Sequence, residues 1–176
     1  RGTSNIESII NQIARTLKCL ADLGIYYTDI KSANLLYKKR ENNEPFVVLG
    51  DLGGAGTIDE GHYVSSYPPF DRRKGEGYLK KPTKKDLSWM IGVVFFELVG
   101  YDMRSFVYDR IVDMSKPNLN KIVNDLAKQN KKYDRLIRGT LDPNPKSRMT
   151  LEEIISITNS NKKVFIEKEP TLYELL

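Results

Sequence analysis

The sequence GIYYTDIKSANLLY at residues 24–37 predicts a polar loop between two ordered elements. Within it, Lys31 stands two positions and Asn34 five positions after Asp29. Gly24 is the residue type that most easily takes the left-handed backbone conformation at which many helices end. The apolar run after Asn34 suits a short strand. We therefore expect a helix before this stretch and a strand at its end.

An amphipathic helix is predicted at residues 4–23. Cys19, the only cysteine, lies in this helix and cannot form a disulfide within the chain. We expect it to be a buried thiol, and the lone cysteine indicates a reducing, intracellular setting. The isoleucines and leucines recur at helical spacing and share one face. They are Ile6, Ile9, Ile10, Ile13, Leu17 and Leu20.

A small β-hairpin is predicted after the loop. Its strands are residues 35–38 and 45–49, and the polar stretch between them suits a turn. Residues 50–82 then hold seven of the twelve glycines and three of the eight prolines, so we expect one long irregular segment. A loop of that length inside a compact domain is usually functional or disordered. Asp51 stands near its start, just behind the second strand.

The run LSWMIGVVFFELV at residues 87–99 is apolar on nearly every side, which is typical of a helix at the centre of a domain. Periodicity alone would also permit a buried strand. Thr83 and Asp86 have the spacing of a helix-capping pair and favour the helix. The expected fold class is therefore mainly α with a small β-hairpin. Three further helices are predicted from their apolar period and start signals, at residues 119–129, 132–141 and 151–158.

Length and composition fit one domain of ordinary globular character. The 176 residues are 40% hydrophobic and 29% charged, with a net charge of +5. No apolar run approaches the roughly 20 residues that a membrane helix needs, and residues 1–8 are too polar for a signal peptide. The lysine pairs lack an aromatic-plus-basic nucleic-acid motif. We expect an intracellular, cytoplasmic protein that binds neither nucleic acid nor membrane.

The polar residues of two loops suit phosphoryl transfer. That reaction needs a carboxylate to orient the attacking hydroxyl, a cation near the transferred phosphate and oxygen ligands for magnesium. Asp29, Lys31 and Asn34 offer such groups in the first loop, and Asp51 follows Asp29 by 22 positions. A hairpin between the two loops can bring them together. Without this chemistry, the same residues would be an ordinary polar loop and a turn.

These motifs resemble the protein kinase family. Residues 25–34 are similar to its catalytic loop, and residues 51–53 (Asp-Leu-Gly) to its magnesium-binding Asp-Phe-Gly. Residues 88–98 resemble the central helix of its C-terminal lobe, and residues 141–150 resemble its closing Asp-Pro…Arg signature. The motifs occur in the family's order, so the resemblance covers residues 4–158. It implies a kinase-like C-terminal lobe.

The resemblance implies a role for each polar residue. Asp29 would be the catalytic base and Lys31 the contact to the γ-phosphate. The Ser and Ala that follow Lys31 indicate a Ser/Thr kinase. Asn34 and Asp51 would bind the cofactors and act as magnesium ligands. The implied cofactors are Mg²⁺ and ATP, with weak binding or none by residues 1–176 alone.

The resemblance also implies an apolar column beneath the adenine of the nucleotide. Leu36 would contact the nucleotide, with Val94 and Leu98 reaching towards it from the central helix. If Leu98 is fully buried, truncation to alanine would cost about 2–5 kcal/mol. Trp89 and Phe95 are expected to be buried if this helix is central.

Three departures from the family pattern carry their own expectations. Tyr27 and Thr28 replace His-Arg in the catalytic loop. Tyr27 can still pack as an aromatic plug, whereas Thr28 removes the arginine that pairs with a phosphorylated segment. Leu52 in place of Phe is expected to fill the same apolar slot. The family's Ala-Pro-Glu is absent and Asp71 is the nearest acid, so we expect a buried Arg148 to pair with Asp71.

No glycine-rich phosphate loop, lysine-bearing strand or glutamate-bearing helix precedes residue 25, so we expect residues 1–176 to lack the N-terminal lobe. One hypothesis is the lower lobe of a Ser/Thr kinase that a missing N-terminal lobe completes and that acts on a protein substrate. The alternative is a non-catalytic mimic, or pseudokinase, that binds and regulates another kinase or its substrate. A third is an unrelated helical domain.

The expected single domain has five parts. They are a scaffold helix, the two loops with their hairpin, an activation-segment-like loop, a helical subdomain and a tail, at residues 4–23, 25–53, 54–82, 87–158 and 159–176.

Overall fold

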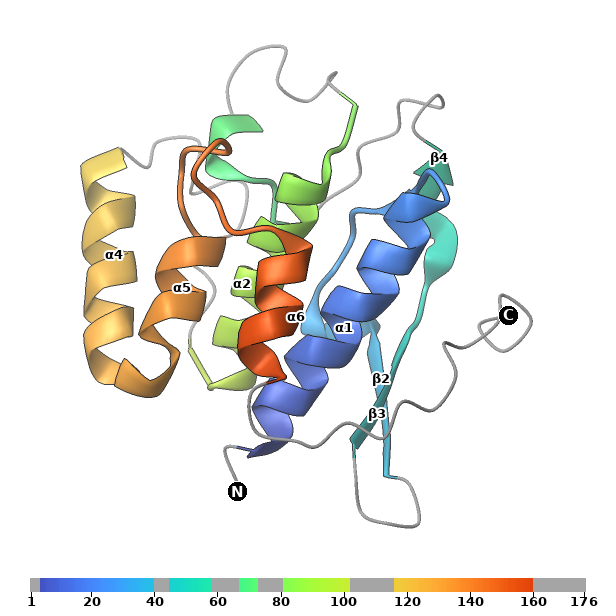
Figure 1. The fold of residues 1–176 in the computed structure, drawn as a ribbon, viewed down its shortest axis with the longest axis horizontal. Coiled ribbons are helices and arrows are strands. Elements are labelled where there is room, and N and C mark those ends of the chain that lie inside the picture. Colours follow the sequence, from blue (N-terminus) through green and yellow to red (C-terminus); the bar gives the residue numbers. More distant parts are fainter. Residues whose placement is uncertain (1–3, 40–44, 58–66, 73–80, 102–115, 160–176) are drawn as a thin grey trace.

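The structure is a computed structural model that describes residues 4–39, 45–57, 67–72, 81–101 and 116–159. Helices dominate this part of the chain, and two small antiparallel sheets lie at one side of it (Figure 1). The expected fold class, mainly α with a small hairpin, is confirmed. The tail from residue 160 onward lies outside the described residues.

The elements have the following bounds. The α-helices are α1 (Ser4–Asp22), α2 (Lys84–Leu98), α4 (Lys116–Gln129), α5 (Asp134–Thr140) and α6 (Leu151–Thr158); the strands are β1 (Ile25–Tyr27), β2 (Leu35–Lys39), β3 (Pro45–Leu49) and β4 (Ala55–Thr57); the 3-10 helices are η1 (Ser32–Asn34), η2 (Leu52–Gly54), η3 (Phe70–Arg72) and η6 (Lys131–Tyr133).

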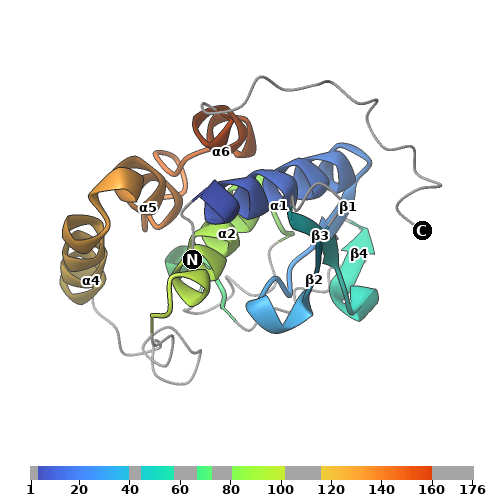
Figure 2. The same ribbon diagram turned by 90° about the horizontal axis from the view of Figure 1, so that it is seen from below.

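Helix α2 lies at the centre of the fold, as the apolar run predicted. All of its residues from Asp86 to Phe96 are buried, Trp89 and Phe95 among them. The helix contacts α1, α5 and α6, and Figure 2 shows it lying beside α1. It starts at a capping box, in which the Asp86 carboxylate accepts from the backbone N–H of Thr83 at 2.6 Å. The cap decides between helix and strand because it satisfies backbone groups that only a helix start leaves open.

Helix α1 buries the predicted face and ends where glycine was expected to end it. Ile10, Ile13 and Leu17 are buried, and Gly24 follows the helix with a φ of +78°. The prediction for Cys19 was wrong, because its side chain is exposed. Cys19 does not lie on the buried stripe, so its position on the helix, rather than the preference of cysteine for interiors, decides its exposure.

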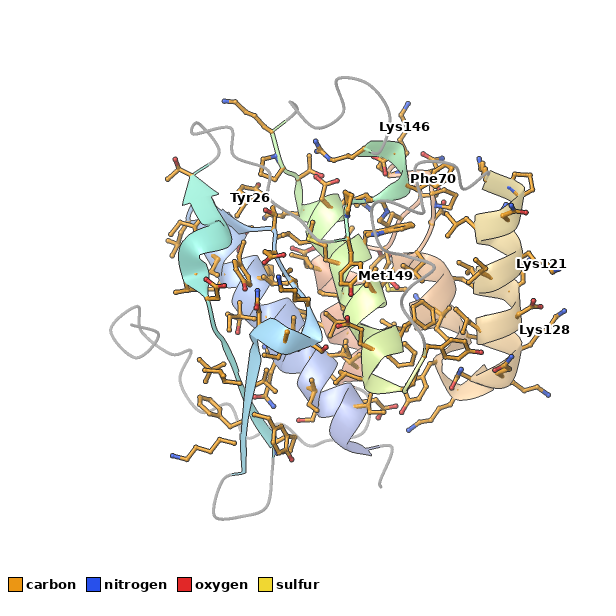
Figure 3. The ribbon with its side chains drawn as sticks, turned by 180° about the vertical axis from the view of Figure 1, so that it is seen from behind. Tyr26, Phe70, Lys121, Lys128, Lys146 and Met149 are labelled. Carbon is orange, nitrogen blue, oxygen red and sulfur yellow. The ribbon has the colours of Figure 1, made fainter. Side chains whose placement is uncertain are left out.

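Two of the three helices predicted in the C-terminal part start at other residues than predicted. Helix α4 begins at Lys116 rather than residue 119, since Pro117 is tolerated in a first turn that needs no N–H donor. The helix predicted at residues 132–141 is a 3-10 turn followed by the short α5. Figure 3 shows Lys121 and Lys128 on the outer side of α4, pointing away from the domain. Helix α6 matches its predicted bounds.

Two expectations about irregular structure need correction. Residues 25–34 and 50–82 were expected to lack strands, but β1 and β4 pair antiparallel, with Ile25 opposite Thr57. These strands are three residues long, too short to show a period of two in the sequence. The predicted hairpin is present as β2 and β3, with Leu36 opposite Val48.

A side chain of α1 closes the outer edge of the hairpin. Gln12 Nε2 donates to the Pro45 carbonyl oxygen at 2.7 Å, and Gln12 Oε1 accepts from the Val47 N–H at 3.1 Å. The neighbouring Asn11 Nδ2 donates to the Ile155 carbonyl oxygen of α6 at 3.0 Å. Two adjacent residues of one helix therefore attach the hairpin and α6 to the core.

Gly92 is the point of closest approach between α2 and the end of α5. A Cβ atom at this position would lie 2.5 Å from Thr140 Oγ1 and 2.9 Å from Leu141 Cδ2. Thr140 is held in place, because its hydroxyl donates to the Leu136 carbonyl oxygen at 2.7 Å. The sequence alone gives Gly92 no such role, since glycine within a helix is otherwise only a weak helix former.

Gly92→Ala is therefore expected to destabilise the protein by about 1–3 kcal/mol, the usual cost of overpacking a core. Alanine would gain about 1 kcal/mol at an exposed helix position, so the sign of the change reports the clash. Chemical denaturation measures it, with Lys121→Ala on the exposed side of α4 as the control. A neutral or stabilising Gly92→Ala would mean that the two helices do not meet here.

Candidate active site

Strand pairing within the two sheets brings the polar loops together. Residues 28–34 join β1 to β2, and residues 50–54 join β3 to β4. Since β1 pairs with β4 and β2 pairs with β3, both loops run from one sheet to the other. The Gly50 N–H donates to the Asn34 carbonyl oxygen at 2.7 Å. The Tyr27 hydroxyl donates to the Gly50 carbonyl oxygen at 2.8 Å. Gly50 thus links the first loop directly to the start of the second.

Asn34 is buried at the centre of the first loop. Its amide nitrogen lies 2.9 Å from the backbone oxygen of Asp29, 3.2 Å from Asp29 Oδ2 and 3.0 Å from the Tyr27 hydroxyl oxygen. These contacts fix the amide plane, because each partner offers an oxygen to the NH₂ group. Asn34 therefore sets the shape of the loop as well as offering an amide oxygen.

The carboxylate of Asp29 is held by two donors. Lys31 Nζ lies 2.7 Å from Asp29 Oδ2, and the Asn34 amide approaches the same oxygen. The Asp29 side chain is 13% exposed and that of Lys31 is 29% exposed, so the ion pair is mostly buried but still in contact with solvent. The Asp29 carboxylate is therefore oriented, nearly buried and next to a cation.

Asp51 has a strained backbone. Its φ of +51° and ψ of +65° lie in the left-handed region, and it is the one described residue other than glycine with a positive φ. Aspartate tolerates this region better than most residues but still at a cost. Strain of this kind gathers at functional sites, where it aims a side chain. The side chain is exposed, at the start of the second loop.

The pKa of the Tyr27 hydroxyl is shifted by burial and by the nearby residues Asp29, Asp51 and Asn34. Burial raises the pKa of Tyr27, and the nearby charges of Asp29 and Asp51 raise this pKa further, against a lowering contribution from the Asn34 hydrogen bond. The hydroxyl therefore stays protonated at neutral pH and acts as the donor to Gly50. Both carboxylates lie close enough to one phenol to influence it. This matches the expected aromatic plug and gives Tyr27 a polar task in addition.

The family model for the protein kinase domain matches residues 2–158, which is most of the chain. The chain belongs to the protein kinase family. A search of curated proteins found no match. Among the described helices of this kinase chain, none is long and apolar enough to cross a membrane.

The contacts of Glu97 with the loop that carries Asp29 and with Tyr67 were not foreseen from the sequence. Glu97, near the end of α2, accepts from the Ser32 N–H at 2.6 Å and from the Tyr67 hydroxyl at 2.9 Å. Burial raises the pKa of Tyr67 to about 12, with a further contribution from its hydrogen bond to Glu97. The phenol is therefore a donor at any physiological pH. Glu97 is the one acid in the apolar run, which was the signal available in the sequence.

The expected pairing of Arg148 with Asp71 is present. Arg148 is fully buried, and its Nη2 atom lies 2.5 Å from Asp71 Oδ1. Arg148 also donates to the carbonyl oxygens of Asp142 at 2.9 Å and Lys85 at 3.1 Å, and its guanidinium lies over the ring of Trp89. The contact ties η3, at the end of the long loop, to the helical subdomain.

The apolar residues expected beneath the adenine of the nucleotide are only partly buried. Val94 is buried, but Leu98 is half-buried, so the condition for a large cost of Leu98→Ala is not met. Leu36 is 60% exposed on the hairpin. The expectation that Leu52 fills an apolar slot was wrong, because this side chain is 50% exposed. Its 3-10 turn directs it outward from the described part of the kinase fold.

Proposed function

We propose that this chain is the lower lobe of a Ser/Thr protein kinase, which transfers the γ-phosphate of ATP to a protein hydroxyl when an N-terminal lobe completes it. The observation that carries this proposal is the Asp29 carboxylate, held by Lys31 and Asn34 beside the loop of Asp51. In phosphoryl transfer, positioning and electrostatics supply most of the catalysis. A carboxylate fixed by two donors is suited to orient a hydroxyl.

The proposed roles follow from the chemistry of each group. Asp29 accepts the proton of the attacking hydroxyl, and Lys31 lies where it can neutralise charge on the transferred phosphate. Asn34 and Asp51 offer amide and carboxylate oxygens, the hard ligands that Mg²⁺ takes together with nucleotide phosphates and water. Mg²⁺ bound there would supply positive charge to the phosphates. The exposed side chain of Asp51, on a backbone in the left-handed region, supports this assignment.

The exposed face of the hairpin supports the need for a completing lobe. Leu36, Val48 and Leu52 are each at least 41% exposed and lie beside the polar loops. Large apolar side chains gathered on a surface usually mark a binding face. In this proposal, the adenine of ATP and an N-terminal lobe cover them. Residues 1–176 alone would then bind Mg²⁺ and ATP weakly or not at all.

The second candidate is a non-catalytic lobe that binds another kinase or its substrate. The observation that favours it is Thr28, which is fully buried where the family pattern has an arginine. A buried threonine has no charge to offer a phosphorylated segment, so activation by phosphorylation of the long loop has no partner at this position. The same exposed apolar face would then contact a partner kinase.

The proposal includes the setting and the partners. With a single cysteine in 176 residues, the chain forms no internal disulfide, which is usual for proteins of the reducing cytoplasm. The proposed partners are a protein substrate or a partner kinase, with no role for nucleic acid or membrane. The mixed surface charge, with a net charge of +5, supports this choice.

Phosphotransfer by the intact natural protein tests the proposal. Labelled phosphate should pass from ATP to casein only with Mg²⁺, and Asp51→Asn should lower the rate by about 10²-fold or more, as when one electrostatic group of a site is removed. Asparagine keeps the left-handed backbone, so the fold should stay as stable as before. Asp134→Asn, on the exposed side of α5, is the control. Binding of a second kinase without any transfer would instead support the non-catalytic candidate.

A further inference from the structure

The residue after Asp71 carries the opposite charge and is also buried. Arg72 is 5% exposed, and its Nη2 atom lies 2.6 Å from Asp86 Oδ2. The same nitrogen donates to the Lys81 carbonyl oxygen at 2.8 Å. An arginine buried to this degree is found almost only where it is paired. Nothing in the kinase pattern quoted above assigns a task to Arg72.

Asp86 is the shared partner of two arginines. Its carboxylate accepts from the N–H and the hydroxyl of Thr83 at the start of α2, at 2.6 and 3.0 Å. Its other oxygen lies 4.0 Å from Arg148 Nη1. With the contact between Arg148 and Asp71, two acids and two bases form one cluster of zero formal charge. Removing one member of such a cluster is costly, because it leaves a buried charge without its partner.

The segment that ends at Arg72 is tied at its other end as well. The Tyr67 hydroxyl donates to Glu97, near the C-terminal end of α2, whereas Arg72 binds Asp86 near its N-terminal end. The two anchor residues of α2 stand eleven positions apart, which is roughly 16 Å along the helix. Between the anchors the segment forms the turn η3, closed by the Arg72 N–H, which donates to the Pro69 carbonyl oxygen at 2.9 Å.

Two features leave this segment little freedom between its anchors. Pro68 and Pro69 are both buried, and proline fixes its own φ near −65°. Glu97 also holds the Ser32 N–H of the loop that carries Asp29. A shift of the segment along α2 would thus move it relative to the catalytic loop.

We propose that Arg72 is a positioning residue, which through Asp86 sets where residues 67–72 lie along α2 and so where a protein substrate meets the catalytic loop. This inference rests on the proposed function for its kinetic consequence only. The described side-chain contacts of Arg72 are to Asp86 and to the Lys81 carbonyl oxygen, and neither residue is among those proposed to bind nucleotide or metal. Its loss should therefore weaken use of the protein substrate and leave nucleotide use unchanged.

The test compares Arg72→Gln with wild type in the intact natural protein, with casein as substrate. The KM for casein should rise by roughly 10- to 100-fold, since a misplacement of about 1 Å can cost about 10²-fold. The KM for ATP should stay the same. For Arg72→Lys, which keeps the charge, the KM for casein should lie between the values of wild type and Arg72→Gln. Arg138→Gln removes an exposed arginine ion pair on α5 and is the matched control. An unchanged KM for casein, or an equal rise for ATP, overturns the proposal.

Hydrogen exchange tests the anchor without any activity. Backbone amides of residues 67–72 should exchange faster in Arg72→Gln than in wild type, and those of α4 should not change. Unchanged exchange at residues 67–72 refutes the anchor even if activity falls. If no variant transfers phosphate, the proposed function fails, while exchange still decides whether Arg72 holds the segment. If Arg72→Gln does not fold, the same exchange comparison on Arg72→Lys gives the answer.

Discussion

Arg148→Ala is expected to lower the free energy of unfolding by about 3–5 kcal/mol, the usual cost of breaking a buried ion pair from one side. The side chain is fully buried, so its removal leaves Asp71 without the arginine that pairs with it and leaves Asp86 with Arg72 as its remaining cation. It also removes the hydrogen bonds that Arg148 donates to the carbonyl oxygens of Asp142 and Lys85, and it removes the group that covers Trp89. Each of these losses lowers the free energy of unfolding.

A double-mutant cycle with Asp71→Ala shows whether the pair accounts for the effect. The Asp71 side chain is 27% exposed, so Asp71→Ala alone should cost less than Arg148→Ala. Denaturant unfolding of both single variants and the double variant should give strong non-additivity. The control is Arg138→Ala, since its pair with Asp134 is exposed and worth about 0–1 kcal/mol. Small losses, or losses that simply add, would show that the two side chains do not interact.

Asp29→Asn is expected to lower phosphoryl transfer by the intact natural protein by about 10²–10⁴-fold, the range for loss of a positioned acid–base group. Asparagine has the same shape and keeps one acceptor oxygen, which can turn to face the donors Asn34 and Lys31, so the loop should keep its form. Binding of ATP should change little, because the carboxylate acts on the hydroxyl rather than on the nucleotide.

Initial rates and a separate nucleotide-binding titration distinguish these two effects. Asp134→Asn, on α5, controls for the loss of one surface charge. A variant that transfers phosphate at the wild-type rate would remove Asp29 from the mechanism. A variant that loses ATP binding as well would assign Asp29 to the nucleotide pocket instead of to the reacting hydroxyl.

The helices that begin with a clear capping signal were predicted well. The apolar run before Leu98 and the short α6 have strong start signals and patterns that their own residues determine. The pairing of β1 with β4 could not be read in the same way. Each strand has three residues, and their partners lie about thirty positions away, with no repeating pattern to record the register.

In the candidate site, too, groupings of residues close in the sequence were predicted and contacts between distant residues were missed. Asp29, Lys31 and Asn34 lie within six positions of one another, so their grouping was foreseen, while the roles given to them stay predictions. The contacts of Glu97 with Tyr67 and of Arg72 with Asp86 were missed. Both join residues brought together only by the path of the long loop over α2. Their charges were visible in the sequence, but nothing local showed which of the many charged residues would be buried.

Gln12 has a consequence for the solubility of the folded chain. A strand edge with open N–H and C=O groups is a template for pairing with another molecule, and short hairpins are especially exposed to this. The amide of Gln12 imitates one residue of a third strand, since it both donates to and accepts from β3. The hairpin also carries the exposed Leu36, Phe46 and Val48, which would favour self-association. One helix side chain thus blocks edge-to-edge aggregation of β3 without an additional strand.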